Sequence, residues 1–170
     1  MEFITHTQRG TDPVSAEVGL FRHYDRQDWD QLVAITESNF VDNPAFQSRY
    51  NNRWIYSREE SLRYYLQWHH RVVETCPDLF LSWVDGEKLV GFYSIMRQPD
   101  PENSYPKYKV ALAAIDPDYR ALKGQNMMQA WLFHNTPDRE WTTVNSPQLT
   151  NTPGLKNNIR SGKNFVAIEV

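Results

Sequence analysis

The residues best suited to chemistry lie in one stretch, residues 113–126, where an apolar run is followed by a turn and then by a helical pattern. The N-terminus of a helix offers unpaired N–H groups and a positive dipole potential. Gly124 allows close approach of a phosphate to the backbone, and Arg120 and Lys123 add positive charge. The stretch therefore predicts a cradle for a diphosphate group.

A second segment, Asn151 to Gly162, reads NTPGLKNNIRSG. Pro153 suits the first turn of a helix and Gly162 suits its end. By itself this pattern fits a plain capped helix as well as a functional segment. It gains weight because it follows the cationic turn within the same chain.

Together the two segments resemble the GNAT superfamily of acyltransferases, whose pyrophosphate loop usually reads Arg/Gln-x-x-Gly-x-Gly/Ala. The resemblance follows the order of elements over residues 15–170. It implies acetyl-CoA or another acyl-CoA as cosubstrate. The residues that it assigns to the cosubstrate are Ala114, Ile115, Arg120, Lys123, Gly124, Gln125, Asn126 and Asn151.

The resemblance also implies direct transfer of the acyl group, with backbone N–H groups near Ala114 and Ile115 holding the thioester oxygen. Asn158 stands where the family often has a tyrosine that protonates the leaving thiolate; an amide donates a hydrogen bond but supplies no proton. We therefore predict a catalytic set of Asn158, Tyr119 and His134. Other candidate bases are His69, His70, Glu74 and Asp116, and other candidate acids are Tyr93, Tyr105 and Tyr108.

A third resemblance concerns the acceptor. The segments SRYNNR (residues 48–53) and YYLQW (residues 64–68) are similar to nucleotide-sugar N-acetyltransferases of the dTDP-fucosamine acetyltransferase type. This implies an amine on a nucleotide-linked sugar, with arginines meeting the diphosphate and aromatic rings stacking on the base or sugar. The predicted substrate residues are Arg49, Arg53, Trp68 and Tyr93.

These residues need a scaffold, and the hydrophobic pattern predicts one of mixed α/β (α+β) class. Capping boxes at Asp28 and Ser57 predict two helices, and Asp85-Gly86 predicts a hairpin turn. We expect a GNAT-like, mostly antiparallel central sheet flanked by helices, with one parallel, splayed strand pair. Residues 1–14 are expected to be an irregular arm and residues 15–170 a single domain. The expected strands are 18–24, 79–84, 88–96, 108–115, 141–144 and 165–170, and the later helices are 125–133 and 153–161.

The composition fits a globular protein of the cytoplasm. The 170 residues carry a formal charge of −3 and include no basic cluster, which argues against nucleic acid as a partner. The only cysteine is Cys76, so no internal disulfide is expected. We expect no signal peptide, no membrane span and no metal site.

Two other functions remain open at this stage. The absent tyrosine favours a catalytically degenerate GNAT-like domain that binds a ligand or a partner. Alternatively, the domain is an interaction module, because the family usually has a further strand after the last one predicted here. A homodimer partner could supply that strand, or the sheet edge could stay open.

Overall fold

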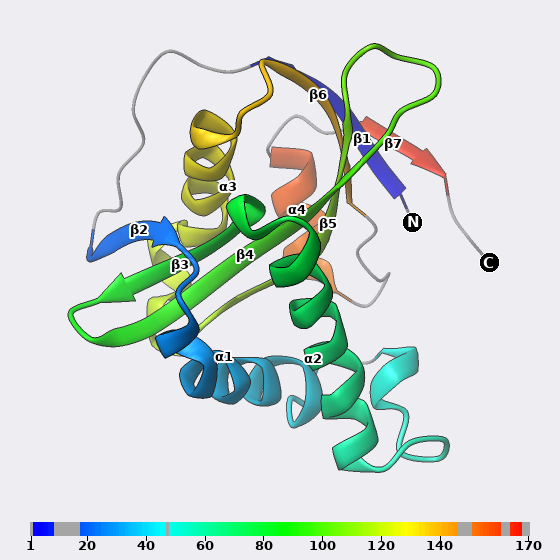
Figure 1. Ribbon diagram of the computed structural model, residues 1–170. Helices are drawn as coiled ribbons and strands as arrows, with labels where there is room; N and C mark the ends of the chain where they lie inside the picture. The colour runs from blue at the N-terminus through cyan, green and yellow to red at the C-terminus, as the bar shows by residue number, and fades with distance from the viewer. Residues whose placement is uncertain (1, 9–17, 47, 146–150, 161–163, 168–170) are drawn as a thin grey trace.

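The computed structural model describes residues 2–8, 18–46, 48–145, 151–160 and 164–167. These residues form a seven-stranded sheet in the order β2-β3-β4-β5-β6-β1-β7 (Figure 1). All neighbouring strands are antiparallel except β5 and β6, which are parallel. The strands are β1 (Glu2–Gln8), β2 (Leu20–His23), β3 (Phe80–Asp85), β4 (Lys88–Gln98), β5 (Lys107–Ile115), β6 (Glu140–Asn145) and β7 (Asn164–Ala167).

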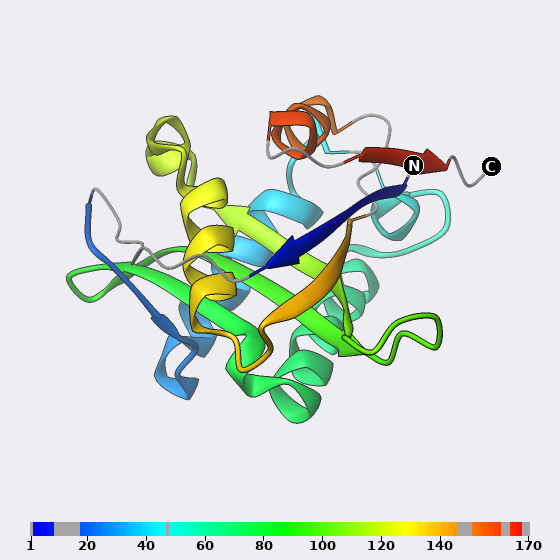
Figure 2. The same cartoon turned by 90° about the horizontal axis from the view of Figure 1, so that it is seen from above.

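Helices cover both faces of this sheet. They are α1 (Trp29–Thr36), α2 (Arg58–Thr75), α3 (Gly124–Asn135) and α4 (Thr152–Arg160). Figure 1 shows α1 and α2 on one side of the sheet and α3 on the other. His69 of α2 contacts the rings of Phe80 and Phe92, whereas Trp83 faces α3. In Figure 2, α4 lies near β1 and β7. The expected mixed, mostly antiparallel fold is confirmed.

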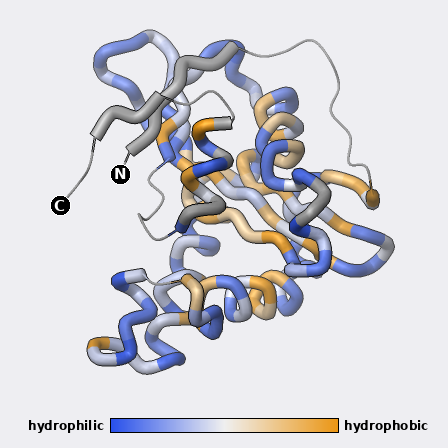
Figure 3. Tube along the Cα trace, turned by 180° about the vertical axis from the view of Figure 1, so that it is seen from behind, coloured by the Kyte–Doolittle hydropathy of each residue, from blue (hydrophilic) through white to orange (hydrophobic). Residues whose placement is uncertain are grey.

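The core lies along the central strands, where β3 and most of β4 are buried. Figure 3 shows apolar residues along these strands and on the helices, with hydrophilic residues in the turns. The largest fully buried side chains include Trp83, Tyr93 and Trp141. Strand β3 is buried on both faces because helices cover both sides of the sheet, which explains its apolar run with Ser82 as the one polar residue before Asp85.

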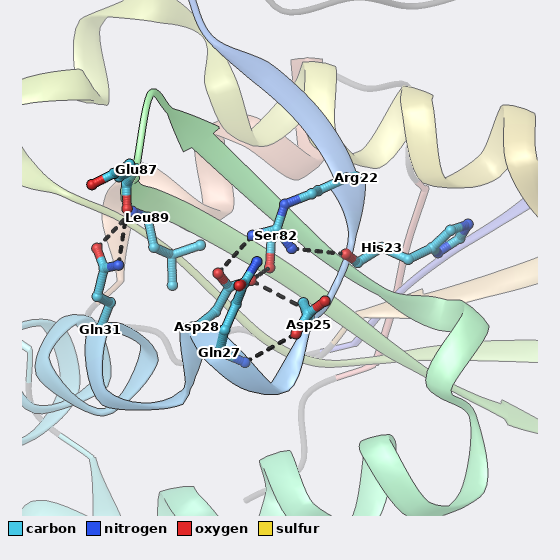
Figure 4. A network of polar contacts seen from close by, with 9 residues as sticks. All are labelled: Arg22, His23, Asp25, Gln27, Asp28, Gln31, Ser82, Glu87 and Leu89. Atoms are coloured by element: carbon cyan, nitrogen blue, oxygen red, sulfur yellow. Dashed lines mark hydrogen bonds and ion pairs between the residues drawn. The ribbon is translucent and has the colours of Figure 1, made fainter.

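A polar network fastens the start of α1 to the sheet, and it differs from the predicted capping box of Asp28 and Gln31 (Figure 4). The box that forms joins Asp25 and Asp28 around a 3₁₀ turn. Asp28 is buried and accepts hydrogen bonds from Arg22 and from Ser82 of β3. Gln31 instead donates to Glu87 O and accepts from Leu89 N in the β3–β4 hairpin. Because the Asp28 carboxylate is buried, it needs hydrogen-bond partners, and it finds one of them, Ser82, 54 residues away. Local spacing could not predict this contact.

Two local predictions are confirmed in detail. Ser57 accepts from the N–H of Glu60, and the Glu60 carboxylate accepts from the N–H of Ser57, so the capping box opens α2 as expected. Gly86 has φ of 59° in the turn between β3 and β4, a conformation that glycine adopts without strain.

The predicted irregular arm is wrong for residues 2–8, which form β1. This strand pairs with β6 from Phe3↔Asn145 to Gln8↔Glu140, and its other edge pairs with β7. The N-terminal segment therefore takes a place in the sheet that we had expected to be empty or filled by a partner molecule. Pairing between chain segments so far apart depends on the tertiary fold, which explains why local sequence did not indicate it.

Among the described residues, no helix is long and apolar enough to cross a membrane. No group of three or more His, Cys, Asp or Glu side chains in this part of the chain could hold a metal ion. The homodimer stays a prediction.

Candidate active site

The parallel strands β5 and β6 pair only at one end. Their register runs from Lys107↔Thr142 to Lys109↔Val144 and then stops, although β5 continues to Ile115. Beyond Lys109, β5 has β4 as its only strand neighbour among the described residues. We call the unpaired side of residues 110–115 the open edge of β5. An open strand edge presents N–H and C=O groups that an extended, amide-bearing ligand can pair with.

The direction of each amide on this edge follows from one hydrogen bond. Asp116 N donates to Val90 O of β4. Because successive residues of a strand point their amides to opposite sides, Ala114 also faces β4, and Ala113 and Ile115 face the open edge. The sequence predicted Ala114 and Ile115 for the thioester oxygen. Of these two residues, Ile115 faces the open edge and Ala114 faces β4, whereas Ala113 also faces the open edge.

An irregularity in the β4–β5 pairing sits just before these amides. The register shifts from Ser94↔Leu112 to Ile95↔Val110, which leaves Ala111 as an extra residue on β5. The Ser94 hydroxyl stabilises the bulge, since its Oγ donates to Leu112 O at 3.1 Å and accepts from Leu112 N at 3.3 Å. Bulges of this kind redirect a strand, and here the bulge lies where β5 and β6 cease to pair.

The open edge leads into the predicted diphosphate turn. A 3₁₀ segment, Pro117–Leu122, follows β5, and Lys123 then adopts φ of 53° and ψ of 19° immediately before α3. Gly124 begins the helix directly against Trp83, since a Cβ at this position would lie 2.1 Å from Cζ3 of that ring. Gln125 and Asn126 continue the first turn. The arrangement has the exposed Lys123 beside a helix N-terminus, a combination that attracts anions.

Two contacts brace this turn against the β3–β4 hairpin. The Tyr119 hydroxyl donates to Asp85 Oδ2 at 2.8 Å, and this bond raises the pKa of Tyr119 above its usual value. Lys88 pairs with Asp116 at 2.9 Å and lies over the Tyr119 ring. Tyr119 was predicted as a catalytic acid; its contacts direct the hydroxyl to the hairpin and make it a weaker acid.

Arg120 is exposed, but two hydrogen bonds hold its guanidinium against the protein. Its Nη2 donates to Asn39 Oδ1 at 2.8 Å, and its Nε donates to Ile115 O at 3.4 Å. Asn39 lies in a π-helical turn, Glu37–Val41, that continues α1. The guanidinium thus joins the end of β5 to the end of α1. The sequence did not indicate a role for Asn39, because its partner Arg120 is 81 residues away.

Asn158 is buried in α4 and contacts the end of β6. Asn145, the last residue of β6, donates from Nδ2 to Asn158 Oδ1 at 2.8 Å. This bond attaches α4 to the strand that diverges from β5. Asn151, predicted to contact the cosubstrate, caps the same helix by accepting from Gly154 N at 3.0 Å. Asn145 was missed in the sequence, since nothing local marks it.

The remaining predicted catalytic groups are scattered. His69 is fully buried, shares a 2.9 Å hydrogen bond with Thr36, and has its pKa lowered by burial to about 3, so it stays neutral in the core. His134 lies in the last turn of α3, about 15 Å along the helix from Gly124. Tyr93 is fully buried on β4, its hydroxyl has no hydrogen-bond partner among the described residues, and burial raises its pKa.

Two of the four predicted acceptor residues, Arg49 and Trp68, lie at an aromatic face made of Tyr50 together with Tyr64 and Trp68 of α2. Tyr50 contacts the other two rings at centroid distances of 5.7 and 5.5 Å. Arg49 lies over the Tyr50 ring at 5.7 Å. Arg53 is engaged elsewhere, because it donates to Ser61 Oγ and Val41 O. Of the predicted set, Arg49 and Trp68 each contact the Tyr50 ring, whereas Tyr93 is enclosed in the core.

The architecture is shared with solved structures of low sequence identity. A possible acetyltransferase from Clostridium difficile 630 gives a TM-score of 0.61 at 9% identity, over 91% of this chain and 99% of its own. A GCN5-related N-acetyltransferase from Sphaerobacter thermophilus gives 0.54 at 13% identity, over 96% of this chain and 47% of its own. The chain has the GNAT fold. A transcriptional regulator from Bacillus halodurans C-125 also matches, with a TM-score of 0.61 at 9% identity over 88% of this chain and 95% of its own.

Comparison of whole sequences finds no relative of this chain. No protein-family model matches the chain, and no curated protein sequence matches it significantly. The chain spans about half the length of the Sphaerobacter thermophilus protein.

Proposed function

We propose that this chain is an N-acyltransferase that moves an acetyl or other short acyl group from acyl-CoA to a primary amine. The observation that carries the proposal is the open edge of β5, which runs directly into the cationic turn and the N-terminus of α3. An edge that pairs with amides and a helix end that attracts phosphate suit the two halves of a CoA molecule. The acetyltransferase names of two proteins with this fold support the same donor.

In this proposal the amide-bearing arm of CoA extends along the open edge and its diphosphate meets the first turn of α3. Lys123 and Arg120 supply positive charge, and the backbone at Gly124 lies close to the phosphates. The amides of Ala113 and Ile115 donate to the thioester oxygen as negative charge develops on it. Transfer then needs no group covalently attached to the protein.

The reaction is direct attack in a ternary complex. The amine nitrogen forms a bond to the thioester carbon, the carbon–sulfur bond breaks, and CoA leaves as a thiolate that takes up one proton. The amine gives up one proton to a base or to water. Asn158 donates a hydrogen bond to the leaving sulfur, so the proton itself comes from solvent or from the amine. His69 takes no part, because it is enclosed in the core.

For the acceptor we propose an amine on a nucleotide-linked sugar. The aromatic face of Tyr50, Tyr64 and Trp68 suits stacking on a sugar or a base, and Trp68 is 36% exposed. Arg49 at its margin suits a phosphate. Because acyl-CoA and nucleotide sugars are cytoplasmic metabolites, the proposal places the protein in the cytoplasm.

The test is calorimetric binding of acetyl-CoA, followed by release of free CoA thiol in the presence of amines. The panel holds an amino sugar, the same sugar linked to a nucleoside diphosphate, and an unrelated alkylamine. We expect acetyl-CoA to bind and the nucleotide-linked amine to give the highest kcat/KM. Binding without turnover of any amine would instead support a catalytically degenerate domain. Absence of binding would refute the proposal.

A further inference from the structure

The guanidinium of Arg120 is held by neutral oxygens. Its two hydrogen bonds in the described structure go to the amide oxygen of Asn39 and the carbonyl oxygen of Ile115. None of the ion pairs among the described residues includes Arg120. A guanidinium has five N–H donors, and these contacts use two of them. The side chain is therefore fixed in place with its charge unneutralised and donors to spare.

The carboxylate of Asp116 is engaged mainly by another cation. Its hydrogen bond with Lys88 is the main cause that lowers the pKa of Asp116, and the positive charge of Arg120 is a smaller one. The carboxylate itself is in contact with Lys88 at 2.9 Å. Arg120 thus remains available to a further anion.

The orientation of the Asn39 amide is forced by its surroundings. Asn39 is 8% exposed, and its Nδ2 donates to Ile35 O at 2.9 Å. An amide nitrogen only donates and an amide oxygen only accepts, so Oδ1 must be the atom that faces Arg120. The π-helical turn that contains Asn39 is a departure from regular helix of the kind often found at functional sites.

These contacts place the guanidinium where the open edge of β5 ends. Ile115 is the last residue of β5, its carbonyl belongs to the open edge, and Arg120 precedes the α3 N-terminus by four residues. In the proposed function the diphosphate of CoA lies at this same position. A fixed, uncompensated cation here would be preorganised for it.

We propose that Asn39 is a positioning residue for acyl-CoA: its neutral amide holds Arg120 at the diphosphate site without neutralising it. This inference rests on the proposed function. It adds Asn39, which lies in the π-helical turn after α1, to the donor site. It explains why an amide, and not a carboxylate, suits this position. A carboxylate would hold the guanidinium more tightly but would compete with the phosphates for it.

The test compares calorimetric CoA affinity in Asn39→Asp, Arg120→Ala, the double variant and the parent protein. Asn39→Asp keeps the side-chain shape and adds one negative charge next to Arg120. We expect it to weaken CoA binding at least tenfold, more strongly at low salt than at high salt. Tm should fall by a few degrees, because a carboxylate oxygen replaces the Nδ2 donor that faces Ile35 O. Asn52→Asp is the matched control, since its exposed side-chain oxygen accepts from Trp54 N and a carboxylate can do the same. It should bind CoA within twofold of the parent.

The double variant decides whether Asn39 acts through Arg120. We expect Asn39→Asp to have less than a twofold effect once Arg120 is alanine. An undiminished effect in that background, or parent-like affinity of Asn39→Asp, would overturn the inference and leave the proposed function intact. If Asn39→Asp does not fold, Asn39→Ala is measured in its place, with a predicted three- to tenfold loss and the same double-variant criterion. A parent protein that binds no CoA would refute the proposed function and this inference together.

Discussion

Replacing Gly124 with alanine tests whether the start of α3 is fixed by packing as well as by its predicted ligand. A Cβ at this position would lie 2.1 Å from Cζ3 of Trp83 and 2.9 Å from two further atoms of the ring. Trp83 is 1% exposed, its Nε1 donates to Val18 O at 2.7 Å, and the rings of Phe21 and Tyr119 pack against it edge-on. The ring therefore has little room to move, and the helix must shift instead.

The energetic terms have opposite signs. Overpacking of this kind costs about 1–3 kcal/mol, whereas alanine gains up to about 1 kcal/mol over glycine in a helix. We expect Gly124→Ala to lose about 1–2 kcal/mol of unfolding free energy, which lowers Tm by about 2–8 °C for a chain of this size. The displaced helix N-terminus should also weaken CoA binding about tenfold, or about 1.4 kcal/mol.

The assay is thermal and urea unfolding, followed by CoA calorimetry, with Trp83→Phe as the relieving partner. The clashing atoms belong to the outer, benzo ring of the two fused rings of the indole. Phenylalanine has a single ring that does not extend as far, so the double variant should lose less stability than the sum of the two single variants. Additive losses, or a Gly124→Ala protein as stable as the parent, would show that Trp83 does not constrain this position.

Three further variants test other parts of the structure. Burial lowers the pKa of His69 to about 3, whereas in the unfolded chain this residue takes up a proton as pH falls below about 6.5. The unfolded state is therefore favoured, and stability is lost, as pH falls between these two pKa values. Urea unfolding should show a loss of about 2 kcal/mol in unfolding free energy between pH 7 and pH 5, and this loss should be absent in His69→Phe. Asn158→Ala should lower kcat by about 10²-fold with CoA affinity changed less than threefold, and equal loss of both would contradict its proposed role. Trp68→Ala should raise KM for the nucleotide-linked amine about tenfold and leave CoA affinity unchanged, corresponding to a lost stacking contact of about 1 kcal/mol or more; weaker CoA binding would place the aromatic face on the donor site instead.

Much of the fold could be predicted because its signals are local. The Ser57 and Glu60 pair marks the start of α2, and the Asp85-Gly86 turn marks the β3–β4 hairpin. The apolar run before Asp116 marks β5, and the turn after it leads into α3 as expected. In each case, residues only a few positions apart carry the relevant hydrogen bonds or dihedral angles.

Other features depend on partners distant in the chain and could not be predicted in this way. Strand β1 forms because β6 and β7 offer edges to it, from more than a hundred residues away. Asp28 was expected to cap α1, but its carboxylate accepts hydrogen bonds from Arg22 and from Ser82, which is 54 residues away. Arg120 lies in the turn before α3 as expected, but its contact with Asn39 required the structure.

The donor-site residues illustrate the same division. Sequence indicated that backbone amides near the end of β5 would face the ligand, and only the hydrogen bond from Asp116 to Val90 decided which ones. It also indicated a close approach at Gly124, whereas the structure adds the Trp83 ring as a second reason for glycine there. The spacing of residues in the sequence can therefore identify the segment that forms the donor site. Which atoms of that segment face the ligand is determined by tertiary contacts.

The most direct test of the central claim is a titration of ¹⁵N-labelled protein with CoA, followed by amide chemical shifts. We predict the largest shifts at the amides of Ala113 and Ile115 and in the first turn of α3, with small shifts around His134 at the far end of that helix. Saturable shifts confined to the aromatic face of Tyr50, Tyr64 and Trp68, or no shifts at millimolar CoA, would contradict the assignment of the open edge of β5 as an acyl-CoA site.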